Sequence, residues 1–380
     1  MTFSSLGLTR ELQQAAAEQQ FKNPYPIQSH SIPAILRGRD LLAIAGSGSG
    51  KTAAFALPLL QLSHSPEPRK RQRVKTLILV PTRELAAQVN EVVCRLGHYL
   101  NPRVKSTAVF GGVAINPQMV ALNGVELLIA TPGRLLDLVA KQSVRLSAIS
   151  LLVLDEADKL LGVGFQDELR QILELLPQKR QNLMFSATFS AQVRQLALNL
   201  LHDPLQIVIR EELSAPEHIA QQVYAVDQSR KGPLLRYLIK KNDWRQLLVF
   251  TSSQKRADNV VGKLLAKGIS AATFHGGMSQ GKRTATLASF KSGELRLLVA
   301  TDLAARGIDI KLLPHLVNYE LPRSPADFIH RIGRTGRGEH TGVAVTLLSP
   351  EEIPHFKTIE KLLGKRLKLI DTADLPLAEY

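Results

Sequence analysis

Short apolar runs alternate with longer amphipathic segments along the whole chain. Most runs are nearly continuous in Val, Ile and Leu, which is typical of strands buried on both faces of a parallel sheet. The runs of the first half are DLLAIA, TLILVP, ELLIATP, LLVLDEAD and NLMFSAT, and those of the second half are QLLVFTS, LRLLVATD, HLVNYELP and GVAVTLL. The amphipathic segments between them, such as residues 255–268 and 280–293, end in glycine, where helices often stop. The pattern predicts an α/β fold, repeated twice.

A polar stretch poor in predicted strands, residues 210–222, separates the two series of runs. The chain has 380 residues, and an ordinary domain has roughly 100 to 200. We therefore expect two domains, residues 1–210 and 217–380, joined by a linker at residues 211–216. Each domain should contain a mostly parallel sheet flanked by helices.

The charge balance narrows the class of partner. The formal net charge is +15, while the hydrophobic share of 44% and the charged share of 21% are those of an ordinary globular protein. Such an excess favours a polyanion, either nucleic acid or an anionic membrane surface. No run approaches the roughly 20 apolar residues of a membrane span, and no Lys/Arg-rich amphipathic helix stands out. Nucleic acid is therefore the expected partner, with no membrane association.

The ends of the chain and its cysteine content bear on its location. The N-terminus lacks a basic segment followed by an apolar run, so the sequence predicts no secretory signal. The single cysteine, Cys94, cannot form an internal disulfide, which agrees with a reducing cytoplasm. Cys94 lies in the apolar pattern of residues 84–100, and we expect it to be a small core residue. We expect a cytoplasmic monomer.

The segment AGSGSGKT, residues 45–52, permits two interpretations. Its Gly/Ser alternation resembles a flexible linker, whereas its end fits the phosphate-binding pattern G-x-x-x-x-G-K-[ST], except that Ala45 replaces the first glycine. Because the segment follows a predicted strand and opens a predicted helix, its backbone N–H groups should form an anion site. In that arrangement Lys51 would reach the β- and γ-phosphates of a nucleotide and Thr52 would ligate Mg²⁺.

A second, acidic element follows the predicted strand LLVL. Asp155 is placed to hold Mg²⁺, directly or through water, and Glu156 to orient and deprotonate an attacking water. Such a tetrad could also be the N-terminal cap of a helix. Its occurrence together with the phosphate loop favours hydrolysis of ATP.

Phosphoryl transfer also needs a cation that neutralises charge on the γ-phosphate. The segment HRIGRTGRG, residues 330–338, has Arg331, Arg334 and Arg337 at spacings of three, which we expect to share one helix face. The alternative is a solvated basic patch. Because this segment lies in the second predicted domain, its action on ATP would require the two domains to close.

The motifs taken together resemble those of the DEAD-box RNA helicases. Nine of them occur in the family's order between Phe3 and Gly364: PYPIQ, AGSGSGKT, PTRELAAQ, GG, TPGR, DEAD, SAT, ATDLAARGID and HRIGRTGR. The resemblance, closest to the bacterial RhlE-like group, implies two tandem RecA-like domains and an ATP-dependent RNA helicase. In this family the phosphate loop begins with alanine, as here. Tyr25 and Ser47 stand where the family usually has threonine, and the fourth motif reads VFTSS.

The resemblance also assigns roles around the nucleotide. Gln28 would pair with the adenine edge, with Phe21 packed on the base and Phe3 in the same element. Ser186 and Thr188 would bond to Asp158 and His330, which would couple the site to domain closure. The remaining assignments are a ribose contact by Asp309, fingers at Arg334 and Arg337, and phosphate and Mg²⁺ binding by Ala45, Gly46, Ser47, Gly48, Ser49, Gly50, Lys51, Thr52 and Asp155.

RNA contacts are implied in both domains. They would come from Pro81, Thr82, Arg83, Gly112, Thr131 and Arg134 in the first domain and from Thr251, Gly276, Gln280, Arg283, Asp302 and Arg306 in the second. Small residues, amide groups and a few arginines suit phosphates better than base edges, so we expect sequence-independent binding to single strands and short duplexes. The aromatic share of 5% agrees, because a binder that stacks on bases would need more aromatic platforms.

Three other functions remain open at this point. The same two domains could form a DNA helicase or translocase, although Gln28 and the DEAD spelling argue against it. An ATP-gated RNA clamp or chaperone is the second alternative. A single-domain P-loop kinase would leave the arginine motif of the second domain unexplained.

Overall fold

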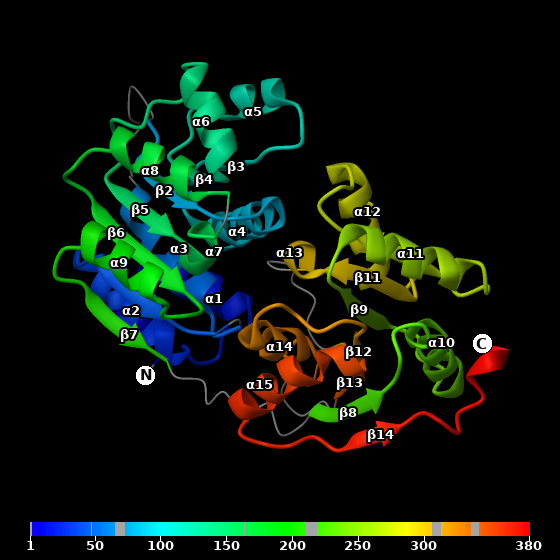
Figure 1. Ribbon diagram of the computed structural model, residues 1–380. Coiled ribbons are helices and arrows are strands. Elements are labelled where there is room, and N and C mark those ends of the chain that lie inside the picture. The colour runs from blue at the N-terminus through cyan, green and yellow to red at the C-terminus, as the bar shows by residue number, and fades with distance from the viewer. Residues whose placement is uncertain are drawn as a thin grey trace. The chain divides into compact units, whose positions relative to one another are not determined.

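The computed structural model describes residues 2–46, 48–64, 73–162, 164–209, 219–305, 313–335 and 342–380. The chain divides into two compact units, Met1–Glu211 and Glu212–Tyr380, and each is built around its own sheet with helices on both faces (Figure 1). The expected linker, residues 211–216, lies outside the described residues.

The first unit contains a parallel sheet whose described strands follow the order β3-β4-β2-β5-β6-β1-β7. The register pairs Leu79 with Ala130 on one side and with Leu154 on the other, so that neighbouring strands end level with one another. The strands are β1 (Leu41–Ile44), β2 (Thr76–Leu79), β3 (Ser106–Val109), β4 (Leu127–Ala130), β5 (Leu151–Leu154), β6 (Gln181–Ser186) and β7 (Leu205–Val208).

Two layers of helices cover this sheet. Because successive side chains of a strand point to opposite faces, Leu151 and Val153 of β5 pack into one apolar cluster, whereas Leu152 and Leu154 pack into another. The first cluster includes side chains from α1 (Arg10–Glu18), α2 (Pro26–Leu36), α3 (Lys51–Ser63) and α4 (Arg83–Leu96), and the second from α6 (Pro132–Ala140), α7 (Ala157–Leu160), α8 (Gln166–Leu175) and α9 (Ala191–Leu200). The short elements η1 (Phe3–Leu6), η2 (Gly97–Tyr99) and α5 (Ile115–Ala121) complete the unit.

The second unit repeats this architecture. Its described strands are parallel and follow the order β10-β11-β9-β12-β13-β8-β14. They are β8 (Ile219–Ala225), β9 (Leu247–Thr251), β10 (Ala271–Phe274), β11 (Leu297–Thr301), β12 (His315–Asn318), β13 (Gly342–Leu348) and β14 (Leu369–Asp371). The helices are α10 (Lys231–Lys241), α11 (Gln254–Leu265), α12 (Gln280–Lys291), α13 (Asp302–Ala305), α14 (Pro325–Ile332) and α15 (Ile353–Leu363), with the short turns η3 (Pro350–Glu352) and η4 (Leu377–Glu379).

The predicted strands are all present, and the strands that the pattern missed lie at or beside the sheet edges. The edge strands β3, β7, β10 and β14 carry polar, small or exposed residues, because an edge strand is covered less completely than a central one. β8, which lies beside β14, begins at Ile219 inside the stretch that was expected to be poor in strands. The continuous apolar pattern therefore identifies the sheet interior only.

The prediction that Cys94 is a core residue was wrong. The side chain is exposed on α4, where the buried positions are Leu85, Ala86, Val89, Val93 and Leu96. These positions form one stripe at helical spacing, and Cys94 lies outside it. Its Sγ atom is 3.5 Å from Ser106 Oγ at the sheet edge.

The end of α6 carries a non-glycine residue in the left-handed backbone region. Gln142 has a φ of 54° and is exposed. The Gln142 N–H bonds to Val139 O and the Ser143 N–H to Leu138 O, both at 2.9 Å, which satisfies the last carbonyls of the helix. A left-handed L-residue costs about 1–2 kcal/mol at such a position, and glycine avoids that cost.

We predict that Gln142→Gly stabilises the protein. The gain should be about 0.5–1 kcal/mol, because relief of the left-handed strain outweighs the greater freedom of glycine in the unfolded chain. Thermal unfolding should show a midpoint raised by about 2 °C. Gln142→Ala is the matched control, since it removes the same side chain but keeps Cβ, and it should leave the midpoint unchanged. Equal midpoints for both variants would contradict the strain argument.

Candidate functional site

The phosphate-loop segment connects β1 to α3 at the carboxyl edge of the first sheet. Gly48 and Gly50 both have a φ of 88°, a region that glycine adopts without steric cost, and the helix begins at Lys51. Lys51 Nζ donates to Ala45 O and Gly46 O, each at 2.7 Å. An ammonium group has three donors, so a third remains for a phosphate oxygen.

Gln28 connects the start of α2 to this loop. The side chain is buried, with Oε1 accepting from Tyr25 N at 2.9 Å and Nε2 donating to Gly50 O at 3.1 Å. A Cβ at Gly50 would lie 2.5 Å from Gln28 Nε2 and 2.8 Å from Tyr25 Cδ2, so only glycine allows this approach. The amide keeps one N–H and one lone pair for a nucleobase. Phe3 in η1 and Phe21 beyond the end of α1 stack with ring centroids 6.1 Å apart.

Asp155 and Glu156 follow β5, two strands away from β1 in the sheet. Asp155 is 3% exposed, and burial together with the Glu156 charge raises its pKa to about 6, although Lys51 opposes the shift. Burial likewise lowers the pKa of Lys51, against the opposing pull of Asp155 and Glu156. The fold therefore brings the loop lysine and the acidic pair into one electrostatic cluster.

Glu156 has a strained backbone. Its φ is 53° and its ψ 49°, a left-handed conformation that is uncommon for a residue with a side chain, and its N–H donates to Asp155 Oδ1 at 2.9 Å. Its carboxylate pairs with Lys159 at 2.9 Å, one turn further along α7. The sequence interpretation missed Lys159, although an acidic and a basic residue three positions apart on a helix are a recognisable pair.

The residues expected to couple the nucleotide site to closure lie around the end of β6. Thr188 Oγ1 donates to Asp158 Oδ2 at 3.3 Å, and Asp158 Oδ1 is buried without a hydrogen-bond partner among the described residues. Ser186 Oγ donates to Thr188 O at 2.8 Å rather than to Asp158. Ala45 N donates to Ser186 O at 3.0 Å, which ties this motif to the phosphate loop.

The oxygen donors at this edge suit Mg²⁺. Thr52 and Asp155 offer a hydroxyl and a carboxylate, and Mg²⁺ prefers a few such hard ligands completed by water and phosphate oxygens. In the part of the chain that the structure describes, no cluster of three or more His, Cys, Asp or Glu could hold a metal ion. Thr52 and Asp155 would supply two ligands, and water and the phosphate oxygens of a nucleotide would supply the others.

The expected RNA-contact residues of the first unit follow the neighbouring strands β3, β4 and β2. Arg83 lies so close to Gly112, whose φ is 76°, that a Cβ there would overlap the guanidinium. Arg134 Nη2 donates to Val113 O at 3.0 Å, so both arginines meet at residues 112–113. Thr82 caps α4 by accepting from Leu85 N at 3.3 Å. Thr131 follows β4 directly, and Pro81 lies two residues beyond the end of β2.

The corresponding residues of the second unit lie at the carboxyl ends of β10, β11 and β9 or just beyond them. Gly276 follows β10, whereas Asp302 follows β11 and pairs through both oxygens with Arg331 at 2.6 and 2.8 Å. Arg283 lies over the Phe274 ring, and the Oε1 atom of the nearby Gln280 is buried without a hydrogen bond among the described residues. Thr251 is fully buried, with its hydroxyl 3.4 Å from Ser253 O and 3.5 Å from Ala300 O. Its side chain therefore faces the sheet.

The prediction that three arginines share one helix face was wrong. Helix α14 ends at Ile332, and Arg334 lies beyond the terminal Gly333. Arg331 is buried inside the unit, where it bonds to Asp302, Asn318 and the backbone of Glu320. Glycine after Ile332 stops the helix before the spacing of three can continue. His330 lies on α14 with its Nδ1 3.9 Å from Asp327 Oδ1.

Four of the expected site residues lie outside the described residues. They are Ser47, Arg306, Asp309 and Arg337. The departure at Ser47 is therefore not placed, whereas that at Tyr25 is placed against Gly50.

Comparison with known proteins identifies two family domains. Residues 25–196 match the DEAD/DEAH box helicase family, and residues 230–339 match the helicase conserved C-terminal domain. The chain is 37% identical over 368 residues to the ATP-dependent RNA helicase CshA of Limosilactobacillus reuteri, covering 97% of this chain and 73% of that protein. It is also 37% identical to DEAD-box ATP-dependent RNA helicase 40 of Arabidopsis thaliana, covering 96% of this chain and 34% of that protein. Such relatives show the family and leave the bacterial subgroup a prediction.

Solved structures of two other proteins share the fold of this chain. Saccharomyces cerevisiae Dbp5 bound to RNA and ADP BeF3 aligns with a TM-score of 0.86 at 29% identity, covering all of this chain and 97% of that one. Mss116p bound to ssRNA and AMP-PNP aligns with a TM-score of 0.86 at 29% identity, covering 98% and 80%. None of the helices described here is both long and apolar enough to cross a membrane. The chain has two tandem RecA-like units and belongs to the DEAD-box family of ATP-dependent RNA helicases.

Proposed function

We propose that this helicase holds RNA and ATP on adjacent stretches of the same sheet edges. The observation that carries the proposal is the strand order. In the first sheet, β3, β4 and β2 are followed by Gly112, Thr131 and Pro81. On the other half of the edge, β5 and β1 are followed by Asp155 and Ala45, and Ser186 ends β6. Ligands of open α/β sheets bind at the carboxyl ends of strands. RNA would therefore occupy one half of this edge and the nucleotide the other half.

The chemistry assigned to the nucleotide half is hydrolysis of the γ-phosphate. Lys51 would bind the β- and γ-phosphates, and Glu156, held by Lys159, would orient and deprotonate the attacking water. Thr52 and Asp155 would hold Mg²⁺, which neutralises charge on the phosphate oxygens. Arg334 and Arg337 would complete the site when the two domains, which we assign to residues 1–210 and 217–380, close over ATP.

The RNA half is suited to backbone recognition. Arg134 is mostly buried, with its Nε paired with Asp137 Oδ2 at 3.4 Å, and its Nη1 atom has no hydrogen-bond partner among the described residues. A buried N–H donor without a partner is costly, and a phosphate that reached Nη1 would satisfy it. The second unit adds positive charge, since residues 251–300 contain eight Lys and Arg against two acidic residues. Binding should therefore be independent of base sequence, with local separation of short duplexes as the outcome.

The proposed substrate and the cysteine content both bear on the cellular location of the protein. An RNA substrate and a single exposed cysteine both agree with a reducing cytoplasm, where we place the protein as a monomer. A DNA translocase and an ATP-gated RNA clamp remain the competing functions, and the following experiment separates them.

We predict that RNA stimulates ATP hydrolysis at least tenfold more than DNA of the same length and sequence. Phosphate release should be measured for the wild type at saturating ATP with each nucleic acid, alongside release of a short labelled RNA duplex. Lys51→Ala is the control, since loss of the ammonium should remove most nucleotide binding. Equal stimulation by DNA would support a translocase, whereas stable RNA binding without turnover would support a clamp.

A second prediction concerns Glu156→Gln. The amide cannot accept the proton of water, so turnover should fall by about 10²- to 10⁴-fold, while ATP and RNA binding persist. Single-turnover hydrolysis and equilibrium binding of both ligands would measure the two effects. Glu174→Gln, on an exposed part of α8, is a matched change of charge and should hydrolyse ATP normally. Turnover at the wild-type rate in Glu156→Gln would remove the general-base assignment.

The raised pKa of Asp155 gives a prediction for the protein without nucleotide. A carboxyl whose pKa is about 6 when folded and near 3.8 when unfolded is destabilising once ionised, so its effect is full above pH 6 and absent below pH 4. Asp155→Asn should therefore raise the thermal midpoint at pH 8, and the gain should vanish as the pH approaches 4. The Asn oxygen can still accept from Glu156 N–H. A gain that does not change with pH would show that burial of the charge is not the cause.

A further inference from the structure

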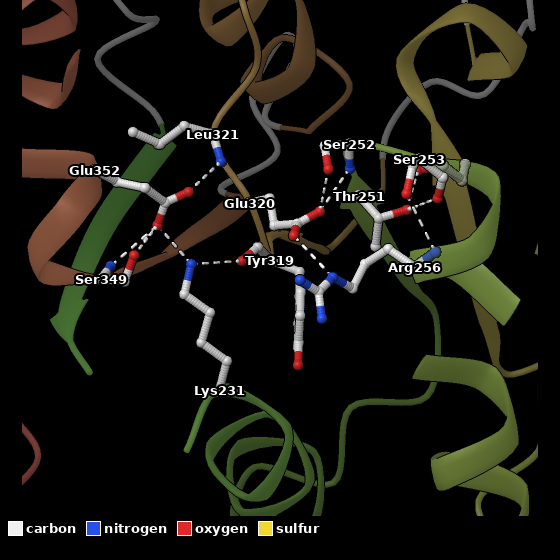
Figure 2. Close-up of polar contacts among 11 residues, drawn as sticks. Lys231, Thr251, Ser252, Ser253, Arg256, Tyr319, Glu320, Leu321, Ser349 and Glu352 are labelled. Atoms are coloured by element: carbon white, nitrogen blue, oxygen red, sulfur yellow. Dashed lines mark hydrogen bonds and ion pairs between the residues drawn. The ribbon is translucent and has the colours of Figure 1, made fainter. Parts of the chain in front are cut away.

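Glu320 occupies a boundary position in the second sheet. It follows β12, and β12 lies beside β9, the last of the three strands whose ends carry the expected RNA contacts. The side chain is only 8% exposed. One oxygen accepts from Ser252 N at 2.8 Å and from Ser252 Oγ at 2.6 Å, and the other accepts from Arg256 Nε at 2.9 Å (Figure 2). A carboxylate at the end of one strand thus fixes the turn that follows the neighbouring strand.

This turn comprises Thr251, Ser252 and Ser253 and leads into α11. Ser253 Oγ accepts from Arg256 N at 3.3 Å and so caps the helix. Glu320 therefore bonds on both sides of the helix cap. It accepts from Ser252, which precedes the cap residue, and from Arg256, which lies in the first helical turn of α11. Because the Thr251 side chain is buried, an RNA strand can reach this turn only through its backbone and its two serines.

The backbone of Tyr319–Leu321 is itself fixed by hydrogen bonds to three charged side chains. Lys231 is fully buried, and its Nζ donates to Tyr319 O at 3.0 Å and to Glu352 Oε2 at 2.5 Å. Glu352 Oε1 accepts from Leu321 N at 3.1 Å (Figure 2). On another side, Arg331 Nη1 donates to Glu320 O at 2.6 Å. The carboxylate of Glu320 therefore projects from a backbone that cannot easily shift.

We infer that Glu320 is a positioning residue for RNA, one that sets the geometry of the Thr251–Ser253 turn without touching the strand itself. The inference rests on the proposed function, because it takes this turn as part of the RNA-binding edge. A preformed turn pays less entropy when it binds a phosphate, so loss of its support should weaken RNA binding. Nucleotide affinity should not change, because the adenine contact and the phosphate loop lie in the first unit, and the arginine fingers assigned to the second unit act mainly on the transition state.

Whether RNA binding weakens or tightens when Glu320 loses its charge distinguishes a positioning role from simple electrostatic repulsion. A carboxylate near RNA repels phosphates, so removal of its charge alone would tighten binding and steepen the dependence on salt. Loss of positioning would weaken binding instead. In Glu320→Gln the shape is kept, but the amide nitrogen cannot accept, so either Ser252 or Arg256 loses its partner.

The experiment compares Glu320→Gln with Glu351→Gln, an exposed glutamate of the same unit whose replacement changes net charge equally. The concentration of single-stranded RNA that gives half-maximal ATPase stimulation is measured, together with the KM for ATP, unstimulated turnover and the thermal midpoint. Glu320→Gln should raise the half-maximal RNA concentration about tenfold, with KM for ATP and unstimulated turnover unchanged. Glu351→Gln should leave that concentration unchanged or lower it.

Ser252→Ala provides a second, milder variant. It removes the hydroxyl donor and keeps the backbone donor, so it should raise the half-maximal RNA concentration about two- to fourfold. Tighter or unchanged RNA binding in Glu320→Gln would overturn the inference, as would a parallel rise in KM for ATP. Absence of RNA stimulation in the wild type would instead overturn the proposed function.

Discussion

Parallel strand pairing is the constraint on which the site depends. A chain that must enter every strand from the same end returns through a helix each time, so all carboxyl ends and the turns after them meet at one edge. In the first unit this edge collects a lysine after β1, two acidic residues after β5 and two arginines after β2 and β4. Residues more than a hundred positions apart in sequence thereby become neighbours.

The same edge stores unfavourable energy. Asp155 is buried with its charge only partly compensated, and Glu156 adopts a left-handed backbone that its side chain disfavours. The surrounding contacts hold both in place, through the bond from Glu156 N–H to Asp155 and the pair between Glu156 and Lys159. Such strain is common where a side chain must face a ligand rather than pack into a core. These two positions lower the stability of the fold, and they keep both carboxylates directed towards the ligand site.

The sequence was informative where one physical requirement dominates and silent where several compete. Central strands were predicted because burial on both faces demands an apolar run, whereas β3 and β10 at the edges mix polar and small residues. The phosphate loop and Asp155 were found because each belongs to a motif that lies within one short, continuous stretch of the sequence. Glu320 was missed because its bonds to the turn after a neighbouring strand have no fixed spacing in the sequence, whereas Lys159 was missed although its spacing of three from Glu156 could have indicated the pair. The helix assumed for three arginines failed because Gly333 ends it, which the spacing alone did not reveal.

In the proposed arrangement, the strand order also limits the length of RNA that each unit can hold. Three neighbouring strands, such as β3, β4 and β2, span only about 10 Å between their outer members, because strands lie about 4.8 Å apart. A stacked nucleic acid strand advances about 3.4 Å per nucleotide, so one edge accommodates roughly three nucleotides. A footprint this short gives little affinity by itself. A longer binding site requires both units to contact the same RNA molecule. The length of RNA that is bound should therefore show whether the two units act together.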